Sequence, residues 1–260
     1  MFGIKLFRLS DVNAVEHLVA CICEFVGSFI FLMSGSVIMQ ESSAISGDQH
    51  MMVLMGSFGF GFGMMISIYM FYDVSGVHLS PTITLAQTIV GNSSIFRFLL
   101  FIPVQFLAAI CCSYAVSGLT PLSVKFAPHM SAEVTTSQGF FIEMFGSCII
   151  ALSVLFITQH TRGVTPAVVI VAPCVGYASF VAHLFSIYYS GGGLNPARSI
   201  AAFLANNHQF PHNYWIYIVG PLCGSIFSAF LFLLVLFFNS FLDQRRIRRK
   251  KVRKQLRKYA

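Results

Sequence analysis

Charged residues are scarce in this sequence, and their scarcity argues against a soluble fold. Of the 260 residues, 10% are charged, 56% are hydrophobic and 28 are phenylalanine. Soluble domains average about 25% charged residues. Together with long apolar runs, this deficit predicts a protein that resides in a lipid bilayer.

The basic residues are also too localised for a nucleic-acid-binding domain. Ten of the sixteen Lys and Arg lie in residues 245–258, so the rest of the chain has six basic residues against nine acidic ones. The net charge of +7 therefore describes a membrane protein with a basic tail.

No pattern typical of a redox, metal or catalytic site stands out. The seven cysteines form no C-x-x-C pair and all lie in apolar runs, so we expect buried free thiols. We find no nucleophile–base pair, metal-ligand spacing or phosphate-binding loop above background. The sequence therefore predicts neither an enzyme nor a resident cofactor or metal.

Six apolar runs are long enough to cross a bilayer, which takes about 20 residues. They lie near 15–38, 51–72, 95–117, 139–159, 165–187 and 214–241. The first run contains Glu24 and is not followed by a small-residue cleavage site. We therefore expect a retained span rather than a signal peptide.

A short motif occurs twice, and the chain is organised around its two copies. Residues 75–81 and 190–196 both read Ser-Gly-x-x-Leu-polar-Pro, 115 positions apart. Each copy occupies the same place relative to its flanking apolar runs. This repetition indicates an internal duplication.

Each motif opens a segment that is apolar but too short to span, 81–91 in the first copy and 196–206 in the second. Ser80 and Asn195 are good helix caps, and a proline follows each of them at the first helical position. We therefore predict two half-helices that stop inside the membrane. Irregular backbone at that depth is tolerated where it is buried in protein or lines a water-filled cavity.

The distribution of basic residues predicts the topology. With six spans, Lys5, Arg8, Arg97, Arg162 and the tail fall on one side, and Lys125 falls on the other. By the positive-inside rule both termini are cytoplasmic, and the two three-span repeats are inverted.

The predicted fold is an all-α polytopic membrane protein with six transmembrane helices and two re-entrant half-helices in two inverted repeats. The expected divisions are a cytoplasmic N-terminus (1–14), a first repeat (15–117), an extracellular loop (118–138), a second repeat (139–241) and a basic cytoplasmic tail (242–260).

Each repeat has a glutamate in its first span, Glu24 and Glu143. An intramembrane carboxylate is costly and commonly functional. It could carry protons, or it could accept hydrogen bonds from loop N–H groups and hold the irregular segment. The matching positions in the two halves favour the second role.

These features resemble the aquaporin (major intrinsic protein) family over about residues 15–240. The resemblance rests on the motif 193–199, its degenerate partner 78–82 and the two glutamates. It implies six tilted helices around a pore, half-helices that meet near the midplane, and a homotetramer with one pore per subunit. Two opposed half-helix N-termini disfavour cations and protons at the centre, whereas a neutral hydrogen-bond acceptor can pass.

The resemblance also assigns roles to individual residues. It places the selectivity constriction at Phe60, His183, Gly192 and Arg198, the central pore motifs at Ser80, Pro81, Thr82, Asn195, Pro196 and Ala197, and loop support at Glu24, Glu143 and His78. The constriction set is similar to the water-selective branch, because Phe and His narrow the passage and the arginine repels cations. Ser199 stands where glycerol-conducting members usually have Asp.

Each constriction residue also has a simpler interpretation when it is considered alone. Phe60 could be one of many core or lipid-facing phenylalanines. His183 could be a core histidine or a titrating gate. Arg198 could extend its charge to the membrane interface.

The chain departs from the family pattern where Ser80 replaces Asn and Thr82 replaces Ala. Serine caps as well as asparagine but is shorter and has one donor, so we expect reduced or altered conduction. Gly192, which leaves room beside Arg198, and Ile218, which stands where water channels usually have Trp, point towards the glycerol branch.

We therefore predict a passive water channel. The alternatives are a channel for small neutral solutes (glycerol, hydrogen peroxide or ammonia) and a poorly conducting membrane-organising or adhesion protein.

The tail 245–258 is expected to be attracted to anionic lipid, at about 1 kcal/mol per charge. It could be a topology anchor, a phosphoinositide-binding segment or a sorting signal. Residues 257–260 resemble a weak dibasic retrieval signal to the endoplasmic reticulum, but we expect the plasma membrane.

Overall fold

The computed structural model describes residues 13–45, 48–76, 78–121 and 123–259, although the side chains of 43–45, 243, 244 and 246–259 lie outside the description. This part of the chain is helical and contains no strand. Its eight helices are α1 (Ala14–Ile45), α2 (Gln49–Ser75), α3 (Pro81–Ile89), α4 (Ile95–Leu119), α5 (Thr136–His160), α6 (Val168–Ser190), α7 (Pro196–Ala205) and α8 (Ile216–Tyr259).

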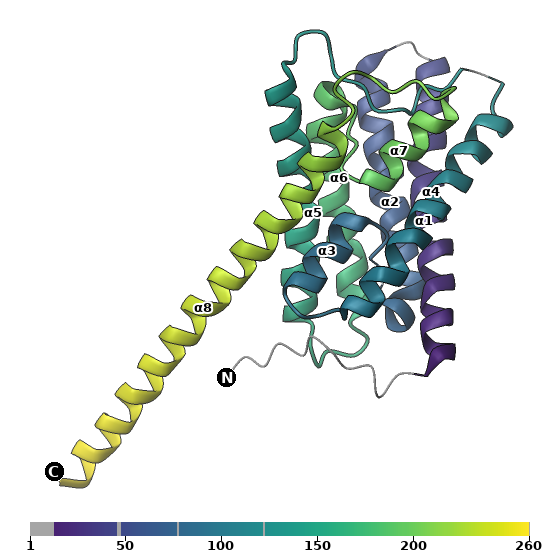
Figure 1. Ribbon diagram of the computed structural model, residues 1–260. Coiled ribbons are helices and arrows are strands. Elements are labelled where there is room, and N and C mark those ends of the chain that lie inside the picture. Colours follow the sequence, from purple (N-terminus) through teal and green to yellow (C-terminus); the bar gives the residue numbers. More distant parts are fainter. Residues whose placement is uncertain (1–12, 46–47, 77, 122, 260) are drawn as a thin grey trace.

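Six of these helices are long and apolar enough to cross a membrane: α1, α2, α4, α5, α6 and α8. The remaining two, α3 and α7, have 9 and 10 residues and are too short to span. The predicted class, six spanning helices with two half-helices, is therefore confirmed. Figure 1 shows α3 and α7 enclosed by the long helices, with α3 towards the end of the bundle where α8 emerges.

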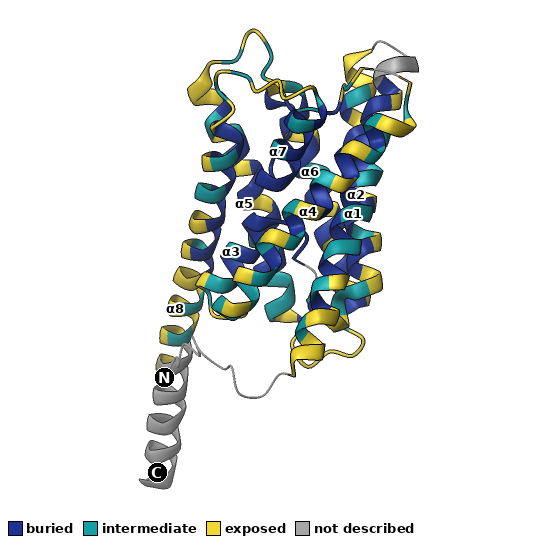
Figure 2. Ribbon diagram, turned by 45° about the vertical axis from the view of Figure 1, so that its right-hand side comes forward, coloured by how far each residue is buried: buried dark blue, intermediate teal, exposed yellow. Residues whose placement is uncertain are grey.

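The packing pairs the long helices around the two short ones. Helix α1 packs on α2 and α4, α2 packs on α6, and α5 packs on α6 and α8. The half-helices contact α4, α8 and each other. Buried residues therefore face the centre, and the exposed residues lie on the outer faces of the long helices, as Figure 2 shows.

A close approach between two glycines fixes α2 against α6. A Cβ atom at Gly61 would lie 3.0 Å from the carbonyl oxygen of Gly176, and one at Gly176 would lie 2.8 Å from that of Gly61. Helices in membranes associate through small residues that let their backbones come this near. Phe60 is the neighbour of Gly61 on α2. The contact therefore fixes how far Phe60 lies from the turns of α6 that come after Gly176.

The fold shows one feature that the sequence analysis did not address, and it corrects one prediction. Helix α8 continues to Tyr259, well beyond its membrane-length part, which ends at Leu242. All seven cysteines are free, but Cys111 and Cys174 are exposed rather than buried. Both cysteines lie on outer helix faces, where a small apolar thiol suits a lipid environment.

Candidate functional site: the central pore

A buried carboxylate holds the loop before α7. Glu143, on α5, is fully buried. Its carboxylate accepts hydrogen bonds from Ser190 Oγ at 2.6 Å, from the backbone N–H of Gly193 at 2.9 Å and from that of Leu194 at 2.6 Å. These three donors come from the last residue of α6 and the loop that follows it. Glu143 therefore links two spanning helices to the irregular segment.

Glu24 repeats this arrangement in the first half of the chain. It is fully buried, and it accepts from Ser75 Oγ at 3.0 Å, from His78 N–H at 2.8 Å and from Leu79 N–H at 3.0 Å. The side-chain amide of Gln105, on α4, adds a fourth bond at 2.9 Å. All four groups donate to the carboxylate, and a protonated carboxyl would have fewer lone pairs to offer them. This arrangement favours loop support over proton carriage.

The supported loops contain a strained turn in both halves. Leu79 and Leu194 have positive φ values of 61° and 50°, in the left-handed region that non-glycine residues rarely occupy. Their own N–H groups are the ones bound by Glu24 and Glu143. The glutamates therefore hold a conformation that costs about 1–2 kcal/mol per residue.

The half-helices begin at the predicted caps, but the two caps differ chemically. Asn195 Oδ1 accepts from the N–H groups of Ala197 at 3.0 Å and Arg198 at 3.4 Å, and its Nδ2 is buried without a partner among the described residues. Ser80 Oγ accepts from Thr82 N–H at 3.3 Å and lies 2.7 Å from Thr82 Oγ1. In both halves a proline follows the cap as the first helical residue, as predicted.

The four predicted constriction residues lie in contact, three through their side chains and Gly192 through its carbonyl oxygen, which accepts from Arg198. The ring centroids of Phe60 and His183 are 4.2 Å apart with the rings 13° from parallel, and the Arg198 guanidinium lies 4.5 Å above the Phe60 ring. All three side chains are at most 2% exposed. They come from α2, α6 and α7, so the fold assembles residues far apart in the sequence.

The tautomer of neutral His183 follows from its partners. His183 Nδ1 lies 2.8 Å from the carbonyl oxygen of Ser179, which can only accept, so Nδ1 carries the proton. Nε2 is buried and has no partner in the described protein. The ring therefore presents a hydrogen-bond acceptor to whatever occupies the space beside it.

Loop carbonyls hold the guanidinium of Arg198. Nη1 donates to Gly192 O at 2.5 Å, and Nη2 donates to Phe126 O at 3.3 Å. Nε has no partner in the part of the chain that the structure describes. Arg198 is therefore bound inside the bundle rather than extended to the interface. The sequence analysis did not identify Phe126. No sequence pattern marks this residue, and only the fold shows that it is buried in the loop after α4 and contacts Arg198.

The packing around two glycines refines the constriction. A Cβ atom at Gly192 would lie 2.7 Å from Ile187 Cγ1 and 3.1 Å from Ser186 Oγ. The room expected beside Arg198 is therefore already filled by α6. At Gly35, which sequence reasoning also missed, a Cβ atom would lie 2.2 Å from Phe60 Cδ1, so the ring rests directly on α1.

Cavities lie beside the C-terminal ends of both half-helices. The one beside α3 has a volume of about 690 Å³, and His78, Gln87 and Arg162 are among its lining residues. His78 also lies with its Nδ1 3.3 Å from Thr84 Oγ1. The cavity beside α7 has a volume of about 460 Å³ and is lined in part by Asn206.

Comparisons with known proteins agree with this architecture. Residues 11–232 match the model of the family described as major intrinsic protein. Aquaporin-2 of Saccharomyces cerevisiae is 32% identical over 229 residues, which cover 85% of this chain and 78% of that protein. Aquaporin-1 of Laccaria bicolor is 33% identical over 227 residues, covering 84% and 71%.

Among solved structures, an aquaglyceroporin from Plasmodium falciparum superposes with a TM-score of 0.73 at 19% identity, covering 82% of this chain and 94% of that one. At that identity the likeness concerns the fold. The family match includes both half-helices and both motifs, and the chain therefore belongs to the major intrinsic protein (aquaporin) family of membrane channels.

Proposed function

We propose that this protein is a passive water channel that excludes ions and protons. The observation that carries the proposal is a set of three buried polar atoms without a partner among the described residues: His183 Nε2, Asn195 Nδ2 and Arg198 Nε. A buried polar group left unsatisfied costs about 1–3 kcal/mol. Water in a shared passage would satisfy all three.

The chemistry of these atoms suits water. Arg198 Nε and Asn195 Nδ2 donate hydrogen bonds, whereas His183 Nε2 accepts one. A permeating molecule that both accepts and donates can therefore replace the hydrogen bonds that it loses on leaving bulk water. Phe60, stacked on His183, offers no polar group and narrows the space.

Electrostatics supports the exclusion of cations. Arg198 keeps a fixed positive charge inside the bundle, bound to carbonyl oxygens. Helices α3 and α7 are in contact, and the N-terminal end of each contributes a positive partial charge of roughly half an elementary charge. A cation, including a hydrated proton, meets an unfavourable potential at both places.

The test of this proposal is an osmotic shrinkage assay on proteoliposomes that contain the purified protein. A jump in sucrose should shrink them faster than protein-free vesicles of the same lipid. A jump in glycerol should shrink them equally fast without re-swelling. Re-swelling in glycerol would contradict water selectivity, and shrinkage no faster than in empty vesicles would contradict conduction.

A channel for small neutral solutes is the second candidate, and the hydroxyl groups of Ser80 and Thr82 at the first cap favour it. The amide of Asn195 uses its oxygen for the cap and leaves its nitrogen, which can only donate, whereas a hydroxyl group can both accept and donate. Gly192 does not add support, because α6 occupies the space where its side chain would lie. Re-swelling with glycerol, hydrogen peroxide or ammonia as the solute distinguishes this candidate.

A poorly conducting membrane-organising protein is the third candidate, and the tight contact between Phe60 and His183 favours it. Replacement of Arg198 or His183 discriminates between the classes. Such a variant should change the solute selectivity of a channel, whereas it should leave an organising or adhesive role unaffected.

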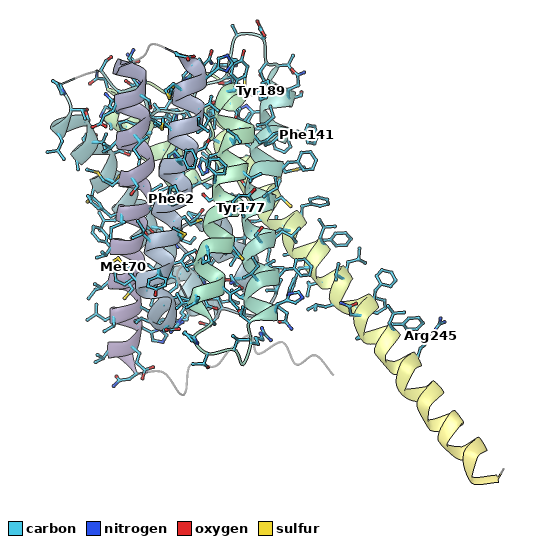
Figure 3. All side chains as sticks on the ribbon, turned by 180° about the vertical axis from the view of Figure 1, so that it is seen from behind. Phe62, Met70, Phe141, Tyr177, Tyr189 and Arg245 are labelled. Atoms are coloured by element: carbon cyan, nitrogen blue, oxygen red, sulfur yellow. The ribbon has the colours of Figure 1, made fainter. Side chains whose placement is uncertain are left out.

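We further propose that the protein is a homotetramer in the plasma membrane and that both of its termini lie in the cytoplasm. The described start of α1 and the end of α8 lie at the same end of the bundle (Figure 1). Figure 3 shows Phe62, Phe141 and Tyr177 on the outer surface, and they are 53%, 50% and 69% exposed. Such side chains suit lipid or a neighbouring subunit. The mass of the complex in detergent, and protease access to the tail in intact cells, test these points.

The basic tail 245–258 is proposed to bind anionic lipid beside its own span. Helix α8 passes without interruption from the apolar segment into this run, so the charges begin within a few residues of the bilayer. The test is co-sedimentation of the tail peptide with lipid vesicles. More peptide should sediment with phosphatidylserine vesicles than with phosphatidylcholine vesicles, and the difference should vanish at high salt.

A further inference from the structure

The two half-helices start with equivalent caps that have unequal side chains. Ser80 and Asn195 share extended backbone conformations, with φ/ψ of −153°/140° and −147°/111°. Asn195 uses its oxygen to cap the helix and leaves its nitrogen as a buried donor without a partner in the described chain. Serine has a single polar side-chain atom, which already accepts the N–H of Thr82.

A second hydroxyl accompanies this serine. Thr82 Oγ1 lies 2.7 Å from Ser80 Oγ, and both residues are 3% exposed. The corresponding residue of the second half is Ala197, which has no polar side-chain atom. The first half therefore has two hydroxyl groups where the second half has one amide.

The protons of this hydroxyl pair, Ser80 and Thr82, can be counted. Each hydroxyl has one proton and two lone pairs. One proton forms the bond between the two oxygens, whichever residue donates it. The second proton has no acceptor among the described residues, and two of the four lone pairs also stay free. The pair thus leaves one donor available, whereas the Asn195 amide nitrogen leaves two.

We propose that Ser80 and Thr82 form one functional unit that replaces an asparagine amide at the centre of the pore, which makes Thr82 a residue that determines conduction. The inference depends on the proposed channel function. It also changes the expectation for Ser80 alone, because Thr82 compensates for the shorter side chain. The unit differs from the Asn195 amide, whose oxygen already accepts two backbone N–H groups, in that it can also accept a hydrogen bond from the permeating molecule.

Neighbouring contacts keep the pair in place. Helices α3 and α7, which begin directly after Ser80 and Asn195, contact each other. Ser225 Oγ, on α8, donates a hydrogen bond to the carbonyl oxygen of Thr82. Thr84 Oγ1 donates to the carbonyl oxygen of Ser80 at 3.0 Å. The backbone is therefore fixed at both Ser80 and Thr82. A fixed backbone suits hydroxyl groups that must point in a defined direction towards a permeating molecule.

The test measures osmotic water permeability per folded protein in proteoliposomes. Thr82→Val has nearly the same shape without the hydroxyl, and it should lower permeability about fivefold, the contribution of one neutral hydrogen bond. Thr82→Ser keeps the hydroxyl and should stay within about twofold of the unmodified protein. Thr88→Val is the matched control, since the Thr88 hydroxyl bonds a backbone carbonyl in the same half-helix at 2.8 Å.

The pairing is tested by repeating Thr82→Val in a Ser80→Asn background. Asparagine supplies its own donor, so the loss caused by Thr82→Val should disappear there. If Thr82→Val conducts like the unmodified protein, or if its effect persists in the Ser80→Asn background, the pair is not a unit and the inference is wrong. Unmodified protein that conducts no faster than empty vesicles would overturn the channel function itself and the inference with it.

Discussion

Replacement of Glu143 by glutamine tests the structural basis of the pore most sharply. The amide has nearly the shape of the carboxylate but only one accepting oxygen. If that oxygen faces Ser190 and Gly193, the amide nitrogen lies where an oxygen is now 2.6 Å from Leu194 N. If the amide is turned round, the Gly193 N–H loses its acceptor instead. Either orientation leaves one buried backbone donor unsatisfied.

The cost follows from this count. A hydrogen bond to a charged group contributes about 1.5–3 kcal/mol, and an unsatisfied buried donor costs about 1–3 kcal/mol. The lost hydrogen bond and the unsatisfied donor describe partly the same interaction, so the two costs are not added in full. We expect a loss of about 3 kcal/mol in the free energy of unfolding. At about 2–4 °C per kcal/mol for chains of this size, Tm should fall by about 6–12 °C. Permeability per folded protein should also fall, because the strained turn at Leu194 positions Asn195.

The assay is thermal unfolding in detergent together with osmotic shrinkage in vesicles. Glu133→Gln is the matched control, because Glu133 is exposed, and it should change stability by less than about 0.5 kcal/mol. A Glu143→Gln variant with unchanged Tm and unchanged permeability would refute the loop-support role. A proton flux that is present in the unmodified protein and absent in the variant would instead favour proton carriage.

Three further substitutions address the constriction. Arg198→Val should let a pH gradient across the vesicle membrane decay faster, because a unit charge about 5 Å away opposes a cation by about 3 kcal/mol at an effective dielectric constant near 20; unchanged decay would contradict its role. His183→Ala should widen the passage, so glycerol re-swelling should appear while water still passes. Gly35→Ala should displace Phe60 and cost about 1–3 kcal/mol in unfolding free energy. Gly118→Ala, where the added methyl meets no neighbour within 4 Å, should not destabilise the protein.

The sequence predicted those parts of the fold that local chemistry determines. A serine or asparagine followed by proline is a strong signal for the start of a helix, so the starts of α3 and α7 at Pro81 and Pro196 could be located. The length of the apolar runs identified the spanning helices. Duplication placed Glu24 and Glu143 in matching positions.

Contacts between distant segments could not be predicted in the same way. Gln105 binds Glu24 across 81 positions, and Phe126 binds Arg198 across 72, with no local pattern to indicate either pair. The sequence suggested free space beside Gly192. The path of α6 could not be predicted, and side chains of α6 fill that space. The hydroxyl pair is also hidden in the sequence, where Thr82 stands only as a replacement for alanine and not as a partner of its neighbour.

The most direct test of the central claim is to measure water flux and proton flux in the same proteoliposomes. An osmotic jump reports water, and a pH-sensitive dye inside the vesicles reports protons under an imposed pH gradient. We predict rapid shrinkage compared with empty vesicles and a pH gradient that decays no faster than theirs. Rapid shrinkage with a collapsing gradient would contradict the exclusion of protons by Arg198 and the opposed half-helices, and slow shrinkage would contradict the channel itself.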